Sequence, residues 1–152
     1  MINVLINGSH GKMGTVLKHC INKTADLSVK YEIDKNTLLS FESLDNSSNK
    51  PDVIIDFSTP EASLSALDYA ACHLIPIVIA TTGFTEAEHN KNLEYSQAIP
   101  IFQASNMSYL IHLFGKILSD ISPLLSYMDV EVIEKHHHHK KDAPSRYSSF
   151  SS

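Results

Sequence analysis

Residues 4–14 read Val-Leu-Ile-Asn-Gly-Ser-His-Gly-Lys-Met-Gly, and this stretch decides the fold. Its first residues, Val4, Leu5 and Ile6, form an apolar run that is typical of a buried strand and stops at a glycine cluster. Apolar residues at helical spacing follow over residues 13–23. A buried strand, a glycine turn and a helix, in that order, predict the opening of an α/β fold.

Strands and helices are expected to alternate through the next part of the chain. Further apolar runs predict strands at 27–33, 51–57, 75–80 and 99–103, and helices are expected at 61–73 and 85–97. Ser58 or Thr59 can cap the first of these helices, and Thr85 with Glu88 forms a capping box for the second. Because each strand is a continuous apolar run, we predict a parallel sheet covered on both faces.

Two other segments have a different character. Residues 36–50 are polar and rich in serine and asparagine, which predicts a loop with a weak helix or a short edge element. Residues 107–127 predict a longer helix, interrupted near Pro123, which would expose an apolar face over 107–125. An alternating strand is expected at 129–135.

The glycines have the spacing G-x-x-G-x-x-G between the first strand and the first helix, which is the setting of a dinucleotide-binding loop. A tight turn without Cβ atoms lets a pyrophosphate approach the backbone, and the helix N-terminus supplies N–H groups. The expected cofactor contacts in this loop are Gly8, Ser9, His10, Gly11, Lys12, Met13 and Gly14. A plain strand-to-helix turn is the alternative, and three glycines favour the dinucleotide.

An acidic residue stands where such folds bind the adenosine ribose. Asp34 lies 20 residues after Gly14, at the end of the second predicted strand. Its carboxylate can accept hydrogen bonds from ribose hydroxyls, which favours NADH. Lys35 beside it can tolerate a 2′-phosphate, which permits NADPH, so the sequence leaves the choice between the two coenzymes open.

Composition excludes several classes of partner. The net charge is −5, with 43% hydrophobic and 19% charged residues, so we expect no nucleic-acid partner. No apolar run has the length of a membrane span, and the N-terminus does not resemble a signal peptide, so we expect no membrane partner and a cytoplasmic location. Cys20 and Cys72 are far apart and are predicted to be buried free thiols.

Several motifs together resemble the dihydrodipicolinate reductase family. They are the glycine loop, residues 52–62, the Ile-Ala-Thr-Thr-Gly-Phe-Thr run of 79–85, and residues 104–108. Ala80 stands where the family most often has glycine. The most specific match is residues 134–145, Glu-Lys-His-His-His-His-Lys-Lys-Asp-Ala-Pro-Ser, which fits the family signature E-x-H-H-x-x-K-x-D-A-P-S.

The resemblance implies a Rossmann-like parallel-sheet domain at 1–105, followed by an incomplete α+β substrate domain at 106–152. It implies NAD(P)H-dependent reduction of 4-hydroxy-2,3,4,5-tetrahydrodipicolinate, a small cyclic dicarboxylate, in the diaminopimelate and lysine pathway. His136 would donate or accept a proton, Lys140 would donate one, and His137 would contact the substrate. Further coenzyme contacts would be Ala80, Thr81, Thr82, Ala104, Ser105, Asn106 and Met107. The family assembles as homotetramers.

The four consecutive histidines at 136–139 have other interpretations. They could be an engineered tag, a metal-binding tract or a solvated polar segment. The flanking Lys-Lys-Asp-Ala-Pro-Ser run argues against a tag, and no cluster of carboxylates or cysteines supports a metal, so we predict no metal site.

The sequence departs from the family after Ser145, where the family continues with Gly-Thr-Ala and further strands. Residues 146–152 read Arg-Tyr-Ser-Ser-Phe-Ser-Ser. One set of codons that encodes them, NGG-TAC-AGC-TCT-TTC-TCT-TCN, gives Gly-Thr-Ala-Leu-Ser-Leu when it is read one base later. We therefore hypothesise a frameshift at this point, which resequencing of the locus would test. A non-catalytic NAD(P)-binding remnant of the enzyme is then the alternative function. Another dehydrogenase of this fold and a histidine metal module are further alternatives.

Overall fold

The computed structural model describes residues 1–35, 37–46, 48–104 and 106–127. The chain divides into two compact units, Met1–Ser105 and Asn106–Ser152.

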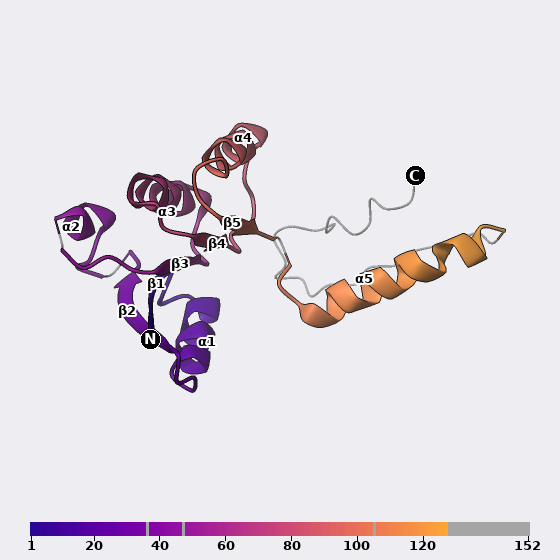
Figure 1. Ribbon diagram of the computed structural model, residues 1–152, viewed down its shortest axis with the longest axis horizontal. Helices are drawn as coiled ribbons and strands as arrows, with labels where there is room; N and C mark the ends of the chain where they lie inside the picture. The colour runs from indigo at the N-terminus through magenta and orange to yellow at the C-terminus, as the bar shows by residue number, and fades with distance from the viewer. Residues whose placement is uncertain (36, 47, 105, 128–152) are drawn as a thin grey trace. The chain divides into compact units, whose positions relative to one another are not determined.

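The first unit is a five-stranded parallel sheet whose strands alternate with helices (Figure 1). The elements in chain order are β1 (Ile2–Asn7), α1 (Lys12–Ile21), β2 (Leu27–Ile33), α2 (Phe41–Asp45), β3 (Val53–Asp56), α3 (Pro60–His73), β4 (Ile77–Ile79), α4 (Glu86–Tyr95) and β5 (Ile101–Gln103). The strand order is β2-β1-β3-β4-β5, and every pairing is parallel. This is the predicted Rossmann-like α/β fold, and all five strands end at the same edge of the sheet.

Helices lie on both faces of the sheet, as predicted. On one face, α2, α3 and α4 cover a core that includes Leu5, Ile54 and Leu67, each fully buried (Figure 1). On the other face, α1 covers a smaller core around Val4 and Ile6. The cover on the α1 face does not extend to β5, where the side chain of Phe102 is 59% exposed.

Local signals explain where the helices begin. Thr59 caps α3, and Pro60 occupies the first turn, where a missing N–H costs nothing. Thr85 and Glu88 form the predicted capping box of α4, with 2.7 Å between the Thr85 nitrogen and Glu88 Oε2. Hydrogen bonds from the Thr85 backbone and then its hydroxyl hold the pKa of Glu88 below its usual value.

One prediction about the first unit needs correction. Cys20 and Cys72 are free, as predicted, but both are exposed, so their predicted burial was wrong. They lie on the solvent sides of α1 and α3, because each helix buries only one stripe of side chains. The region at 36–50 holds a five-residue helix, α2, which Ser40 and Ser43 stabilise with a capping box.

In the second unit, the described residues form α5 (Tyr109–Ile121) and a 3-10 helix (Ser122–Leu125). The interruption falls at the predicted proline, and α5 has no buried residue. Its apolar side chains are exposed, including Leu110 at 72% and Phe114 at 60%. The predicted strand at 129–135 lies outside the described residues. None of the helices described in residues 1–127 has the length and apolar character needed to cross a membrane.

Candidate functional site

The polar residues of the first unit gather where the parallel strands end. Asn7 ends β1, Asp56 ends β3, and Asp34 and Ala80 directly follow β2 and β4. Ligands of open parallel sheets bind beyond the carboxyl ends of the strands, where the loops diverge. This edge is therefore the candidate site.

The glycine loop between β1 and α1 has no room for side chains at two positions. Gly8 has φ +80°, and a Cβ there would meet the backbone carbonyl oxygen of Phe57. A Cβ on Gly14 would meet the carbonyl oxygen of Gly8 and lie 2.8 Å from the Cα of Ser9. At Gly11 the nearest atom to such a Cβ is the Gly8 oxygen, at 3.2 Å, so that position is less confined. Because they have no Cβ, Gly8 and Gly14 let the loop turn tightly, with Gly8 close to the backbone that follows β3.

Helix α1 begins at Lys12 directly after this loop. Its N-cap is Gly11, and no side chain accepts a hydrogen bond at this end of the helix. The first-turn N–H groups, which have no partner inside a helix, are therefore left for a ligand. No acidic residue stands in the first turn, so the positive end of the helix dipole is not neutralised there. An anionic group such as a pyrophosphate suits this position.

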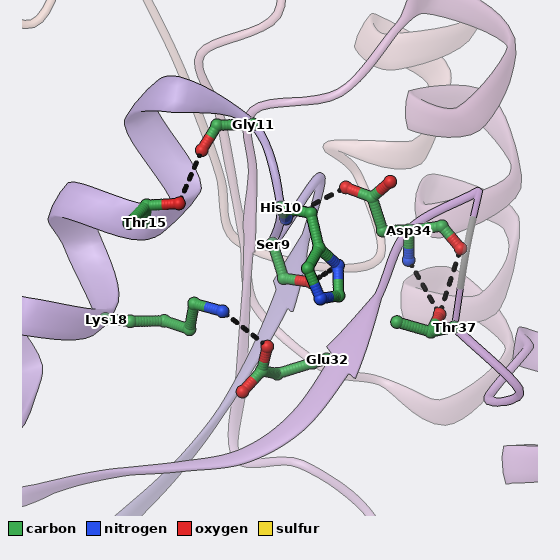
Figure 2. Close-up of polar contacts among 8 residues, drawn as sticks. All are labelled: Ser9, His10, Gly11, Thr15, Lys18, Glu32, Asp34 and Thr37. Atoms are coloured by element: carbon green, nitrogen blue, oxygen red, sulfur yellow. Dashed lines mark hydrogen bonds and ion pairs between the residues drawn. The ribbon is translucent and has the colours of Figure 1, made fainter.

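Asp34 is bonded to the glycine loop (Figure 2). Its Oδ2 accepts a hydrogen bond from the backbone N–H of His10 at 2.9 Å, and its Oδ1 accepts one from the backbone N–H of Lys35 at 2.8 Å. The hydroxyl of Thr37 donates to the carbonyl oxygen of Asp34 at 2.9 Å and accepts from its backbone N–H at 2.9 Å. The carboxylate is therefore fixed beside the loop, with acceptor capacity remaining for a ligand hydroxyl.

The other predicted loop residues differ in exposure. Ser9 is fully buried, and its Oγ lies 3.2 Å from Nδ1 of the exposed His10. Lys12, Met13 and Lys35 are exposed. Their side chains are accessible to a ligand at this edge, whereas Ser9 is buried and its backbone N–H donates to the Ile33 carbonyl oxygen at 3.3 Å.

A buried polar network, which sequence reasoning missed, lies next to this loop. Asp56 is fully buried, and its carboxylate accepts four hydrogen bonds. Asn7 Nδ2 and Ser58 Oγ donate to Oδ1 at 2.8 and 2.5 Å. Ser63 Oγ donates to Oδ2, and Thr81 Oγ1 donates to the same oxygen at 2.7 Å. A charged residue that ends an apolar strand was the available signal.

In the segment after β4, the side chain of Thr81 is part of this network. The Thr81 hydroxyl donates to Asp56 and accepts a hydrogen bond from the backbone N–H of Ser58 at 3.0 Å. A hydroxyl has one proton to donate, so Thr81 has none left for a ligand. Thr82 is exposed, and Ala80, whose N–H donates to the carbonyl oxygen of Asp56 at 2.9 Å, is half-buried.

The remaining predicted site residues come later in the sequence. Ala104 is half-buried after β5, and its N–H donates to the Ile79 carbonyl oxygen at 3.2 Å. Asn106 and Met107 belong to the second unit, where Asn106 Oδ1 accepts from the Ser108 N–H at 2.8 Å. Outside the described residues lie Ser105, His136, His137 and Lys140.

The described residues of the site fit a dinucleotide. The absence of space for a Cβ at Gly8 and Gly14, the uncapped α1 N-terminus and the fixed Asp34 carboxylate match the needs of a pyrophosphate and a ribose. No group of three or more metal-ligating side chains occurs among the residues that the structure describes. The histidine run at 136–139 is not among them.

Comparisons with known proteins agree on one family. Residues 2–107 match the family described as "Dihydrodipicolinate reductase, N-terminus", and residues 111–148 match "Dihydrodipicolinate reductase, C-terminus". The 4-hydroxy-tetrahydrodipicolinate reductase of Clostridium novyi (strain NT) is 40% identical over 151 residues, which cover 95% of this chain and 60% of that protein. The enzyme of the same name from Caldanaerobacter subterraneus subsp. tengcongensis is 40% identical over 149 residues and is covered to 59%.

A solved structure shows the same fold. The dipicolinate-bound dihydrodipicolinate reductase from Paenisporosarcina sp. TG-14 superposes with a TM-score of 0.73 at 26% identity, over 97% of this chain and 63% of that one. The chain thus spans about 60% of the length of the curated relatives that it matches.

Proposed function

This chain belongs to the dihydrodipicolinate reductase family, and from that premise we propose that it binds NADH or NADPH at the glycine-loop edge of the sheet. The observation that carries the proposal is the loop at Gly8 and Gly14, which excludes side chains in front of an uncapped helix. The first-turn N–H groups of α1 would bind the pyrophosphate, and Asp34 would accept hydrogen bonds from the adenosine ribose. The exposed Thr82 is better suited than Thr81 to donate a hydrogen bond to the coenzyme.

The proposed reaction is reduction of 4-hydroxy-2,3,4,5-tetrahydrodipicolinate to tetrahydrodipicolinate. Loss of water from the substrate leaves a conjugated ring, and the bound coenzyme supplies a hydride to one ring carbon. The neighbouring carbon takes a proton, so the balanced products are tetrahydrodipicolinate, water and the oxidised coenzyme. His136 and Lys140 would supply that proton, because imidazole and ammonium groups can donate at neutral pH. His137 would contact a substrate carboxylate.

A second candidate is coenzyme binding without turnover. It is favoured by one observation: the described residues that fit the dinucleotide all lie within the first unit, Met1–Ser105. This function needs none of the residues at 136–140. Either function places the protein in the cytoplasm, where the reduced coenzyme is found.

Fluorescence titration with NADH and with NADPH tests the binding that both candidates share. We expect saturable binding to the wild-type chain and its loss in Gly14→Ala, whose new Cβ would push the Gly8 carbonyl out of the turn. Gly115→Ala is the matched control, since a Cβ there would meet nothing within 4 Å beyond the neighbouring backbone of its own helix. The absence of binding by the folded wild-type chain would overturn both candidates.

A turnover assay then separates the two functions. Oxidation of NAD(P)H that depends on the substrate and is lost in His136→Gln and Lys140→Met would support the reductase. Tight coenzyme binding with no turnover would support the second candidate. Sedimentation of the same preparation reports whether the chain forms the family tetramer.

A further inference from the structure

The buried Asp56 carboxylate joins three segments that are far apart in the sequence. Its donors are Asn7 at the end of β1, Ser58 and Ser63 on the β3–α3 connection and in α3, and Thr81 after β4. Asn7 directly precedes the glycine loop, and Thr81 directly precedes the exposed Thr82. One side chain therefore holds together the segments that form the proposed coenzyme edge.

The hydrogen bonding of this carboxylate is complete. An ionised carboxylate only accepts hydrogen bonds, with about two sites on each oxygen. Oδ1 accepts from Asn7 and Ser58, and Oδ2 accepts from Ser63 and Thr81, so each oxygen has two donors. No cation among the described residues forms an ion pair with Asp56. A buried charge without a counter-ion is costly unless hydrogen bonds and dipoles compensate it.

The helix that follows provides further compensation. Ser63 lies in the first turns of α3, which begins at Pro60, so the carboxylate is bonded at the positive end of that helix. The Asn7 amide also donates to the carbonyl oxygen of Ala62 at 3.1 Å, which ties the end of β1 to the same helix. The network is thus built for a negative charge at this point and for one arrangement of the three segments.

We propose that Asp56 is a positioning residue for coenzyme binding, which acts by holding the Asn7–Gly8 turn, the Ser58 segment and the Thr81–Thr82 segment in one fixed geometry. The inference rests on the proposed function for its ligand, NADH or NADPH. Asp56 itself is fully buried and needs no contact with the coenzyme. Its effect passes through the backbone of Gly8 and through the loop that begins at Thr81.

The first test is Asp56→Asn in the full chain, with Asp52→Asn as the control. An asparagine amide would present N–H groups to two donors that now face an oxygen, so two hydrogen bonds would be lost. Asp52 directly precedes the same strand, is exposed, and accepts from the Asn3 N–H at 2.6 Å, so its variant has the same change of charge at the opposite end of β3. We expect Asp56→Asn to raise the Kd for NADH about tenfold and Asp52→Asn to change it less than about twofold. Equal Kd values for Asp56→Asn and wild type would overturn the inference.

A second pair of variants keeps the inference testable if Asp56→Asn does not fold. Thr81→Val retains the shape of the side chain but removes its bond to Asp56 and the acceptor of the Ser58 N–H. Thr81→Ser retains the hydroxyl. We expect a Kd about tenfold higher for the valine variant and a Kd within about twofold of wild type for serine. Equal weakening by both would show that the methyl group, and not the network, matters.

Double substitution tests whether the two residues act through one bond. If they do, the double variant, which carries both Asp56→Asn and Thr81→Val, should have a Kd for NADH close to that of the single variant that binds NADH less tightly. A Kd increase equal to the product of the single increases would mean independent action and would overturn the inference.

Hydrogen exchange of the coenzyme-free chain separates this inference from the proposed function. We expect Asp56→Asn to speed exchange of the Ser58 N–H, which donates to the Thr81 hydroxyl, by about tenfold. The Ala80 N–H donates to the main-chain carbonyl oxygen of Asp56, and its exchange should rise as well if the carboxylate holds this segment in place. Amides at the amino ends of the strands, such as Asp52, should be unchanged. Uniform acceleration would show a general loss of stability and would overturn the inference. If the wild type bound no coenzyme, the proposed function would fail although these exchange rates could still show the network holding the loops.

Discussion

The Asp34 carboxylate accepts a hydrogen bond from the His10 backbone N–H, with 2.9 Å between Oδ2 and the nitrogen. This bond joins the end of β2 to the glycine loop, although 24 residues separate the two in the sequence. The same carboxylate is the proposed ribose acceptor. Support of the loop and choice of coenzyme are therefore expected to depend on one side chain.

Asp34→Ala should weaken NADH binding about tenfold, because the loop loses its bond and the ribose loses an acceptor. NADPH binding should weaken less, because removal of the carboxylate also removes its electrostatic repulsion of the 2′-phosphate. Isothermal titration with both coenzymes measures the ratio. Glu32→Ala is the matched control, since Glu32 lies on the same strand and pairs instead with Lys18 at 2.7 Å. Unchanged NADH affinity in Asp34→Ala would contradict both roles.

Alanine substitutions in the glycine loop should destabilise the first unit in a defined order. Gly8→Ala combines φ +80° with a contact to the Phe57 carbonyl, and we expect a loss of at least about 2 kcal/mol in the free energy of unfolding. Gly14→Ala should cost a similar amount. Gly11→Ala should cost less than about 1 kcal/mol, because its Cβ would stand 3.2 Å from the nearest atom. Urea unfolding monitored by circular dichroism measures the series, and equal losses at all three positions would refute the geometry.

Tyr69→Phe should stabilise the protein at neutral pH. The Tyr69 side chain is only 4% exposed, and its hydroxyl has no hydrogen-bond partner among the described residues. A buried hydroxyl without a partner costs about 1 kcal/mol or more, so its removal should raise the free energy of unfolding by about that amount. The ring contact with Phe41, at 5.2 Å between centroids, is retained in the variant. A loss of stability on this substitution would reveal a partner for the hydroxyl.

The same tyrosine should govern stability at alkaline pH. Burial, with the nearby Asp45 carboxylate, raises the pKa of Tyr69 from 10.0 to about 12. The folded state thus holds the proton more tightly than the unfolded chain. The stabilisation that results from this difference in pKa is fully present below pH 10 and is lost as the pH rises from 10 to about 12. Unfolding curves across this range should show a steeper decline for wild type than for Tyr69→Phe.

At acidic pH the Thr85–Glu88 capping box should produce the opposite dependence. Hydrogen bonds from Thr85 lower the pKa of Glu88 below 4.5, so the folded state favours the ionised carboxylate. Its contribution is present above pH 4.5 and is lost as the pH falls through the lowered pKa. Carboxyl titration by NMR should show the Glu88 pKa moving part of the way back toward 4.5 in Thr85→Ala, which removes the hydroxyl donor but keeps the backbone N–H. Glu86, in the same helical turn but outside the box, is the internal control.

Most of the fold could be predicted from the sequence because the strands are short apolar runs separated by clear turn and cap signals. The predicted strand at 27–33 coincides with β2, and the capping box at Thr85 begins α4 as expected. Strand ends were predicted less well: the run at 75–80 pairs only over Ile77–Ile79. The length over which a strand pairs depends on the length of its neighbours, and β5 has three residues that pair with β4. The predicted burial of Cys20 was wrong for a related reason: the width of the face that a helix buries depends on the part of the sheet that the helix covers.

The candidate site was only partly predictable. The glycine spacing and Asp34 have strong local signals, and both lie at the carboxyl edge of the sheet. The Asp56 network has only a weak local signal, a charged residue at the end of an apolar strand, because its donors extend from Asn7 to Thr81 and meet only after the sheet has formed. The sequence also does not reveal that the Thr81 hydroxyl donates its proton to Asp56 and therefore has none left for a ligand. The roles assigned to His136, His137 and Lys140 remain predictions.

The strand order has a consequence for how the chain acquires its structure during synthesis. β1 is translated before both of its partners, and the second of them is β3, which ends at Asp56. Until that point is translated, one edge of β1 is unpaired and the side chains of Val4, Leu5 and Ile6 lack their final cover. The nascent chain therefore carries this apolar segment unprotected until β3 has been made, the interval in which a chaperone that binds exposed strands would be most useful.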